Sequence, residues 1–220
     1  MYSRDLLNKY WDAKLENIKQ VLEKNNFEVF ISPSLKDAKQ IFIDEILNKL
    51  DNVDKIAFGG SLTVVESGIY DYLKGAEKYN IIDTYDRNVD QEEFIERRRQ
   101  ALLSDLFITG TNAITEDGIL VNLDGFGNRV AAIAFGPKYV TLLVGRNKVV
   151  SDLQDGINRI KNYSACVNAI RLNRKTPCTK ILECKDCNSP DRICNVWVIT
   201  EKSVPPKRIK IILINEDCGI

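Results

Sequence analysis

Residues 55–72, KIAFGGSLTVVESGIYDY, hold the pattern that decides the fold. The run Lys55-Ile-Ala-Phe58 is short, apolar and typical of a buried strand, and it leads directly into Gly59-Gly60-Ser61. Apolar residues at helical spacing follow, so the stretch predicts a strand, a tight glycine turn and a helix. A strand that passes directly into a helix is half of a βαβ unit, the building block of parallel sheets.

The same alternation of short strands and amphipathic helices extends in both directions from this stretch. Helices are expected over 4–25, from a Ser34–Asp37 capping box to Leu50, from Asp90 to Leu103, over 129–135, after a Ser151–Gln154 cap, and over 164–173. Strands are expected over 27–31, 80–83, 105–109, 139–144, 196–199 and 209–214, with a β-hairpin of 112–115 and 119–122. We predict one α/β domain over residues 1–220, built on a mostly parallel sheet flanked by helices, with a cysteine-rich excursion at 174–195.

The composition excludes several classes of function. The 220 residues include 31 Lys and Arg, 31 Asp and Glu, and no histidine. Balanced charge gives no overall field that would draw the chain to nucleic acid or to a membrane, so neither is expected as a partner. Without histidine there is no Ser-His-Asp triad, and any metal must be held by thiolates or oxygens. The charged N-terminus and the lack of an apolar run of about 18 residues predict a cytoplasmic protein.

The Gly59-Gly60-Ser61 turn is the first candidate ligand site. Backbone N–H groups and the positive end of a helix dipole converge at a strand-to-helix junction, and the hydroxyls of Ser61 and Thr63 add donors. The junction is either a cradle for a phosphate or carboxylate, or an ordinary turn with a serine cap. It matches neither GxxxxGK[ST] nor GxGxxG, which disfavours a nucleotide P-loop and a dinucleotide site. Glu66, further along the helix, either faces the ligand or is solvated.

A second junction lies at Leu123-Asp-Gly-Phe-Gly-Asn-Arg129, directly before a helix of small residues. Because ligands of parallel sheets bind at the carboxyl ends of the strands, both junctions are expected to meet in one cleft. The alternative is a packing glycine pair with an asparagine cap. The arginine run 97–99 is either a solvated helix face or the source of one side chain that pairs with a substrate carboxylate. The predicted ligand is a small organic anion, and its predicted binding residues are Gly59, Gly60, Ser61, Thr63, Glu66, Asn112, Asp124, Gly125, Asn128 and Arg129.

Four cysteines cluster near the end of the chain, and in a reducing compartment such a cluster favours metal or redox chemistry over disulfides. Its members are Cys178, Cys184, Cys187 and Cys194. The C-x-x-C spacing lets two thiolates of one loop, Cys184 and Cys187, bind the same metal centre. The outer two cysteines, Cys178 and Cys194, then supply the remaining two ligands. Four thiolates suit a [4Fe–4S] cluster, which is the preferred interpretation, or tetrahedral zinc. Reduced thiols without metal are the third interpretation, and Cys166 is expected in the core.

Residues 104–150, SDLFITGTNAITEDGILVNLDGFGNRVAAIAFGPKYVTLLVGRNKVV, with GGSLTVVESG at 59–68 before them, resemble the LUD domain of the lactate-utilisation family. CKDCNSPDRICN at 184–195 and RIKIILINEDCG at 208–219 resemble its short, stand-alone clostridial-type members. The resemblance implies a fold like those of ribose-5-phosphate isomerase, glucosamine-phosphate deaminase and the CoA transferases. It also implies a role in the oxidation of lactate or a similar 2-hydroxy acid, with electron carriers on separate redox partner proteins.

Two other functions stay open beside this one. Residues 110–114 and 120–126 are also similar to methylthioribose-phosphate isomerase, whose catalytic aspartate corresponds to Asn112 here. An asparagine cannot act as a carboxylate base, although it can hydrogen-bond a substrate hydroxyl or carbonyl. The other hypothesis is a non-enzymatic accessory or regulatory subunit that docks a partner through a metal-stapled cysteine loop.

Overall fold

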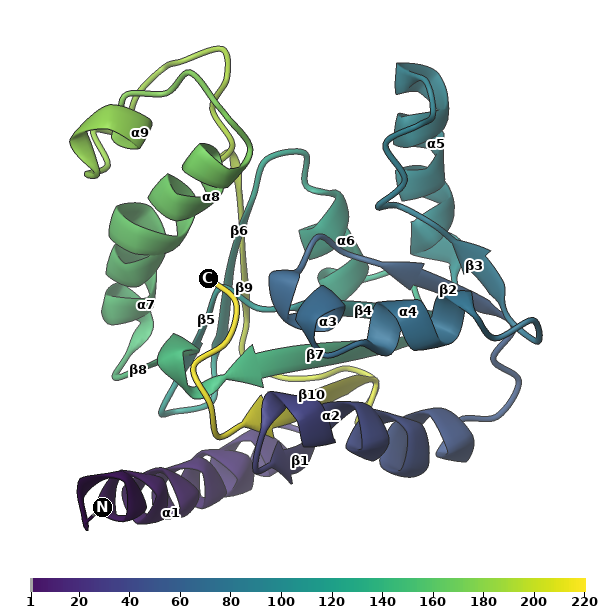
Figure 1. The fold of residues 1–220 in the computed structure, drawn as a ribbon, viewed down its shortest axis with the longest axis vertical. Helices are drawn as coiled ribbons and strands as arrows, with labels where there is room; N and C mark the ends of the chain where they lie inside the picture. The colour runs from purple at the N-terminus through teal and green to yellow at the C-terminus, as the bar shows by residue number, and fades with distance from the viewer. Residues whose placement is uncertain (1) are drawn as a thin grey trace.

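The computed structural model describes residues 2–220, with side chains described from residue 6 onward. Its main sheet contains six parallel strands in the order β1-β10-β7-β4-β2-β3 (Figure 1). The strands are β1 (Glu28–Ser32), β10 (Ile209–Ile214), β7 (Tyr139–Gly145), β4 (Leu106–Gly110), β2 (Lys55–Phe58) and β3 (Asn80–Ile82). A parallel sheet flanked by helices confirms the predicted α/β class.

Helices cover both faces of the main sheet. The core on one face is formed with α1 (Tyr2–Lys24) and α6 (Asn128–Ala134), and the core on the other with α2 (Leu35–Ile41), α3 (Leu62–Glu66) and α4 (Ile69–Lys74). Strand β4 shows why both faces are apolar, because Phe107 packs into the first core while Leu106 and Ile108 pack into the second. These two cores fix the strand ends that carry the candidate site.

A second, four-stranded sheet stands beside the first in the order β8-β5-β6-β9. The predicted hairpin is present as β5 (Ala113–Thr115) paired antiparallel with β6 (Leu120–Asp124). Strand β9 (Val196–Thr200) pairs antiparallel with β6, and β8 (Val149–Val150) pairs parallel with β5. The sequence did not predict that these short strands form a separate sheet, because the partners β6 and β9 are far apart along the chain.

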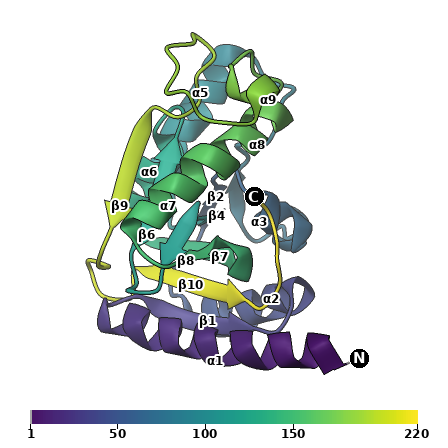
Figure 2. The same ribbon diagram turned by 90° about the vertical axis from the view of Figure 1, so that its left-hand side faces the viewer.

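The remaining helices stand above the sheets (Figures 1 and 2). Helix α7 (Leu153–Arg159) continues through a π-helical turn, Ile160–Ser164, into α8 (Ala165–Arg171). Helix α5 (Gln91–Gln100) rises on the opposite side in Figure 1. The cysteine-rich segment, 174–195, contains the short helix α9 (Cys178–Ile181). None of the described helices is both long and apolar enough to cross a membrane.

Helix caps show which local predictions were right. Ser34 accepts a hydrogen bond from the Asp37 N–H at 3.1 Å, and Asp90 accepts one from Glu93, as predicted. The Ser151–Gln154 cap was wrong, because Asp152 takes the cap position and accepts from the N–H three residues later at 2.9 Å. An aspartate at this position adds a favourable charge at the helix N-terminus, which explains the shift by one residue.

Candidate functional site

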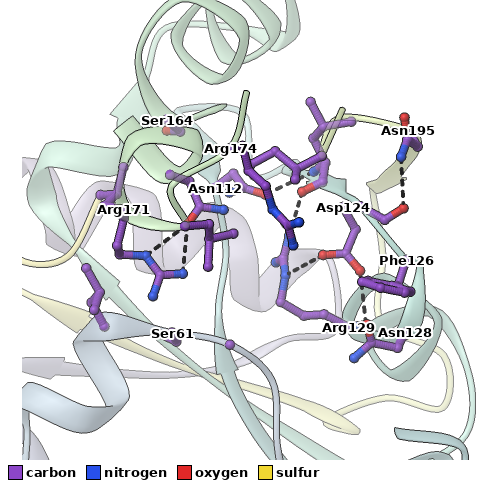
Figure 3. Close-up of a pocket in the computed structure, with 18 of the residues that line it drawn as sticks. Ser61, Asn112, Asp124, Phe126, Asn128, Arg129, Ser164, Arg171, Arg174 and Asn195 are labelled. Atoms are coloured by element: carbon purple, nitrogen blue, oxygen red, sulfur yellow. Dashed lines mark hydrogen bonds and ion pairs between the residues drawn. The ribbon is translucent and has the colours of Figure 1, made fainter. Parts of the chain in front are cut away.

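A cleft of about 670 Å³ opens at the carboxyl ends of β2 and β4. Helix α5 forms one wall and α8 the opposite wall, and residues 190–195 of the cysteine-rich segment close a third side. Both predicted junctions reach this cleft, and Figure 3 shows side chains from each of them around it. The predicted residues that line it are Gly60, Ser61, Thr63, Asn112, Asp124, Gly125, Asn128 and Arg129.

Ser61 sits at the mouth of the first junction as the N-cap of α3. Its Oγ accepts a hydrogen bond from the Val64 N–H at 3.4 Å. The loop is held by Tyr85, whose Oη donates to the Gly59 carbonyl at 2.7 Å and accepts from the Ser61 N–H at 3.2 Å. Burial raises the pKa of Tyr85 to about 12, so the phenol stays a neutral donor at physiological pH. This clamp fixes the Ser61 hydroxyl at the edge of the cleft.

Arg129 lies beneath the second junction and is 7% exposed. Its Nη1 donates to the Gly110 carbonyl at 3.1 Å and to Asn122 Oδ1 at 2.7 Å, and its Nη2 donates to Asn112 Oδ1 at 2.8 Å. Nη2 also reaches the Leu123 carbonyl, and Nε lies 3.4 Å from Asp124 Oδ1 (Figure 3). The guanidinium is therefore turned toward the protein. We assign Arg129 to holding the cleft floor in shape.

Asp124 and Asn112 belong to the same buried network. Oδ2 of Asp124 accepts hydrogen bonds from the N–H groups of Gly127 and Arg129, so this carboxylate caps the start of α6. Oδ1 of Asn112 also accepts from the Leu123 N–H at 2.9 Å. No carboxylate base stands at the position that corresponds to the isomerase aspartate, and the Asn112 oxygen is already engaged. Nothing in this geometry favours the isomerase hypothesis.

A lysine that the sequence analysis did not single out lies at the cleft floor. Lys148 follows β7, is 3% exposed, and donates from Nζ to Thr63 Oγ1 at 3.2 Å. Burial is the main reason that the pKa of Lys148 falls to about 8. The buried thiol of Cys218 lies close enough to oppose that effect, and burial raises its own pKa to about 11. A titratable amine thus faces the same space as Ser61.

Basic side chains dominate the lining of the cleft. Seven of the lining residues are basic and two, Asp124 and Asp191, are acidic. The basic ones are Arg87, Arg98, Arg129, Lys148, Arg171, Arg174 and Arg192. Arg98 is the one residue of the predicted arginine run in the lining; it stacks 3.3 Å over the Phe94 ring, and burial lowers its pKa to about 10. Such an excess of positive charge suits an anionic ligand.

Arg174 and Arg171 are two lining arginines that have no carboxylate partner among residues 6–220. The Nε of Arg174 is buried and has no hydrogen-bond acceptor in the part of the chain that the structure describes. Arg171, on α8, uses Nε and Nη2 to hold the Asn168 side-chain oxygen of its own helix (Figure 3). Neither arginine forms an ion pair with a carboxylate of residues 6–220, so both guanidinium groups are available to a ligand in the cleft.

The four clustered cysteines line one small cavity between α8 and the cysteine-rich segment. All six cysteines of the chain carry free thiols. Cys166, predicted in the core, is buried, and its Sγ donates to the Lys161 carbonyl at 3.3 Å. Cys184 Sγ accepts from the Asp186 N–H at 3.5 Å, a contact common at metal-binding thiolates. Within residues 6–220, however, no three Cys, Asp or Glu side chains are already placed to ligate one ion.

Comparison with known proteins identifies the family. The family model of the LUD domain matches residues 15–214. The chain belongs to the LUD-domain family. The family is linked to lactate utilisation, and the matched range contains both cleft junctions and the cysteine-rich segment. No curated protein matches the sequence.

Two solved structures resemble this LUD-domain chain. A DUF162-family protein from Deinococcus radiodurans is 11% identical with a TM-score of 0.51, over 93% of this chain and 98% of that one. The eIF2B delta of Chaetomium thermophilum is 15% identical with a TM-score of 0.32, over 68% of this chain and 55% of that one. At these identities the first similarity concerns the fold alone, and it supports the predicted architecture of the LUD domain.

Two predicted site residues of this LUD domain do not line the cleft. Glu66 is exposed on α3, which agrees with its solvated interpretation. Gly59 faces the interior, where an added Cβ would lie 2.6 Å from Thr109 Oγ1 and 2.9 Å from a Phe107 ring atom. Its small size is needed for close packing between β2 and β4. Gly60, by contrast, has nothing within 4 Å of the same position.

This difference predicts opposite outcomes for two neighbouring substitutions. Gly59→Ala is expected to destabilise the LUD domain by about 1–3 kcal/mol, because the methyl group overpacks the junction. Gly60→Ala is the matched control and is expected to leave the free energy of unfolding within about 0.5 kcal/mol of the parent. Urea unfolding of both variants measures this. Equal destabilisation by the two would show that the junction is packed differently.

Proposed function

We propose that this LUD-domain protein binds a small organic anion in the cleft and thereby assists the oxidation of a 2-hydroxy acid such as lactate. The observation that carries the proposal is the excess of seven basic over two acidic lining residues. Lys148 is buried and has no ion pair with a carboxylate of residues 6–220, and a bound carboxylate or phosphate offsets the cost of burying that charge. The family's link to lactate utilisation supports a hydroxy acid or the corresponding oxo acid as ligand.

The cleft contains groups for both recognition and proton handling. The Ser61 hydroxyl, the Lys148 amine and the arginines Arg171 and Arg174 face it from separate elements. Arginine suits planar bidentate recognition of a carboxylate, while serine and lysine supply donors to a second oxygen. Under this proposal the electrons of the oxidation leave through redox partner proteins, because none of these side chains is an electron acceptor.

Substitution of Ser61 tests the anion site. Ser61→Asp keeps a good N-cap for α3 but adds a fixed negative charge to the cleft, so oxalate affinity is expected to fall by about tenfold or more, which is roughly 1.4 kcal/mol. Isothermal titration calorimetry with oxalate measures this. Ser34→Asp, the same change at the N-cap of α2 and outside the cleft lining, should bind oxalate like the parent. Unchanged affinity in Ser61→Asp, or a parent protein that binds no oxalate, would contradict the proposal.

The cysteine cavity favours a second role, a metal-stapled loop that supports the cleft wall or docks a partner. The donor set fits a metal in kind and number, because four thiols face one space. Four thiolates suit a [4Fe–4S] cluster or a single tetrahedral zinc ion equally in number. Lys161 and Arg192 also line the cavity, and both form ion pairs with Asp186, at 2.6 Å and 3.2 Å.

Elemental analysis of anaerobically purified protein separates these metals. We expect about four irons with inorganic sulfide per chain for the cluster, or about one zinc per chain for the alternative. Four freely titratable thiols without metal would contradict the metal role altogether.

A further inference from the structure

Lys148 has the surroundings of a reactive amine. It lines the floor of the cleft, and its Nζ makes a hydrogen bond to Thr63 Oγ1 at 3.2 Å and no ion pair with any carboxylate of residues 6–220. Gly110 lies beside it, since a Cβ there would be 3.7 Å from Nζ and 3.0 Å from Ser61 Oγ, so the amine and this hydroxyl are neighbours in the cleft lining. A ligand atom bound in the cleft can therefore approach the nitrogen.

The groups around the amine favour its neutral form. Arg159 and Arg129 bring positive charge near it, whereas Cys218 and the exposed Glu66 act in the opposite direction. Burial outweighs all of these, and it places the pKa of Lys148 at about 8. A desolvated lysine beside other cations is a recognised way to activate an amine for attack on a carbonyl carbon.

We propose that Lys148 Nζ condenses reversibly with the carbonyl carbon of a small 2-oxo acid, forming a protonated imine. This inference rests on the proposed function, because it assigns the ligand of the same cleft to the 2-oxo acids. The neutral amine adds to the carbonyl carbon and forms a C–N bond. The carbonyl oxygen takes up protons and leaves as water, so a C=N bond replaces the C=O bond and no electrons are transferred.

Neighbouring hydroxyls are placed to serve this condensation. Thr63 Oγ1, hydrogen-bonded to Nζ, can accept a proton from the attacking nitrogen and return it to the departing oxygen. Ser61 Oγ and Lys148 Nζ both lie near Gly110, at 3.0 Å and 3.7 Å from the point that its Cβ would occupy, and both residues line the cleft. A 2-oxo acid bound at this part of the cleft thus contacts the amine and a hydroxyl together, with the arginines left for its carboxylate.

Reductive trapping with pyruvate and sodium borohydride tests the inference on the full chain. Intact mass spectrometry should show one added group per chain with the mass of pyruvic acid less one oxygen atom, and peptide mapping should place it on Lys148. The yield should rise between pH 6 and pH 8 as the amine loses its proton. Lys148→Arg keeps the charge but cannot form an imine, so it should give no adduct, whereas Lys138→Arg, at an exposed lysine paired with Asp105, should react like the parent.

The outcomes separate this inference from the proposed function. If oxalate binds but pyruvate leaves no adduct, Lys148 acts only as a charge and the imine inference fails while the anion site stands. An adduct on another lysine also overturns it, and mapping in the parent protein decides this even if Lys148→Arg does not fold. If neither oxalate binding nor an adduct is found, both fail.

Discussion

Replacing Arg129 by methionine is expected to lower the free energy of unfolding by about 3–5 kcal/mol, the cost of removing one partner from a buried charged pair. The substitution removes the ion-pair partner of Asp124. It also removes the hydrogen-bond donor of four other acceptors, namely the side-chain oxygens of Asn112 and Asn122 and the backbone carbonyls of Gly110 and Leu123. Asn122, Gly110 and Leu123 are buried, so their oxygens cannot recover the lost hydrogen bonds from solvent, whereas Asp124 and Asn112 are half-buried. Urea unfolding without ligand measures the change.

Arg98→Met is the matched control for this prediction. Arg98 also lines the cleft, but it makes one hydrogen bond, to the Phe94 carbonyl, and stacks on the ring of the same residue. Its removal is expected to cost about 1 kcal/mol. If Arg129→Met unfolds at the same urea concentration as Arg98→Met, the buried network does not hold the cleft floor.

Losing one thiol of the cysteine cavity is expected to release the loop that closes the cleft. Structural zinc contributes about 10–16 kcal/mol in small peptides, so losing even a quarter of that lowers the melting temperature by roughly 10 °C in a domain of this size. Cys187→Ser should show this fall, and a chelator should produce it in the parent. Residues 174–195 should also become sensitive to protease, because the segment holds few buried apolar side chains.

Cys218→Ser is the control for the metal, since Cys218 lies away from the cysteine cavity and should retain the parent's metal content. The wall of the cleft gives a further readout. Asn195 donates to the carbonyls of Asp124 and Gly125, and Ile193 packs against Gly125, so release of the loop should also weaken oxalate binding. A Cys187→Ser protein that melts like the parent, with the loop equally protected, would show that packing alone holds this segment.

Local patterns in the sequence predicted the main elements. The apolar run 55–58 coincides with β2, and the caps at Ser34 and Asp90 were found where short polar side chains precede helices. These features depend on neighbours along the chain, so the sequence is enough to find them. The six-stranded parallel sheet follows from the repeated strand–helix alternation.

The parts of the site that the sequence missed depend on contacts between distant segments. Lys148 ends the polar run Arg146-Asn-Lys148, and nothing local distinguishes it from an exposed loop lysine. It is buried because the end of β7 places its side chain against Thr63, a residue that is far from it in the sequence. Arg171, at the end of α8, and Arg174, which follows it, likewise line the cleft only because α8 forms one of its walls. No hydrophobic periodicity or sequence motif predicts these contacts between distant segments.

A crystal structure of the protein with oxalate tests the central claim most directly. We expect density for one oxalate in the cleft, with its oxygens within hydrogen-bond distance of Ser61 Oγ or Lys148 Nζ and of at least one arginine of the wall. Oxalate bound elsewhere, with water filling the cleft between Ser61 and Arg171, would contradict the account.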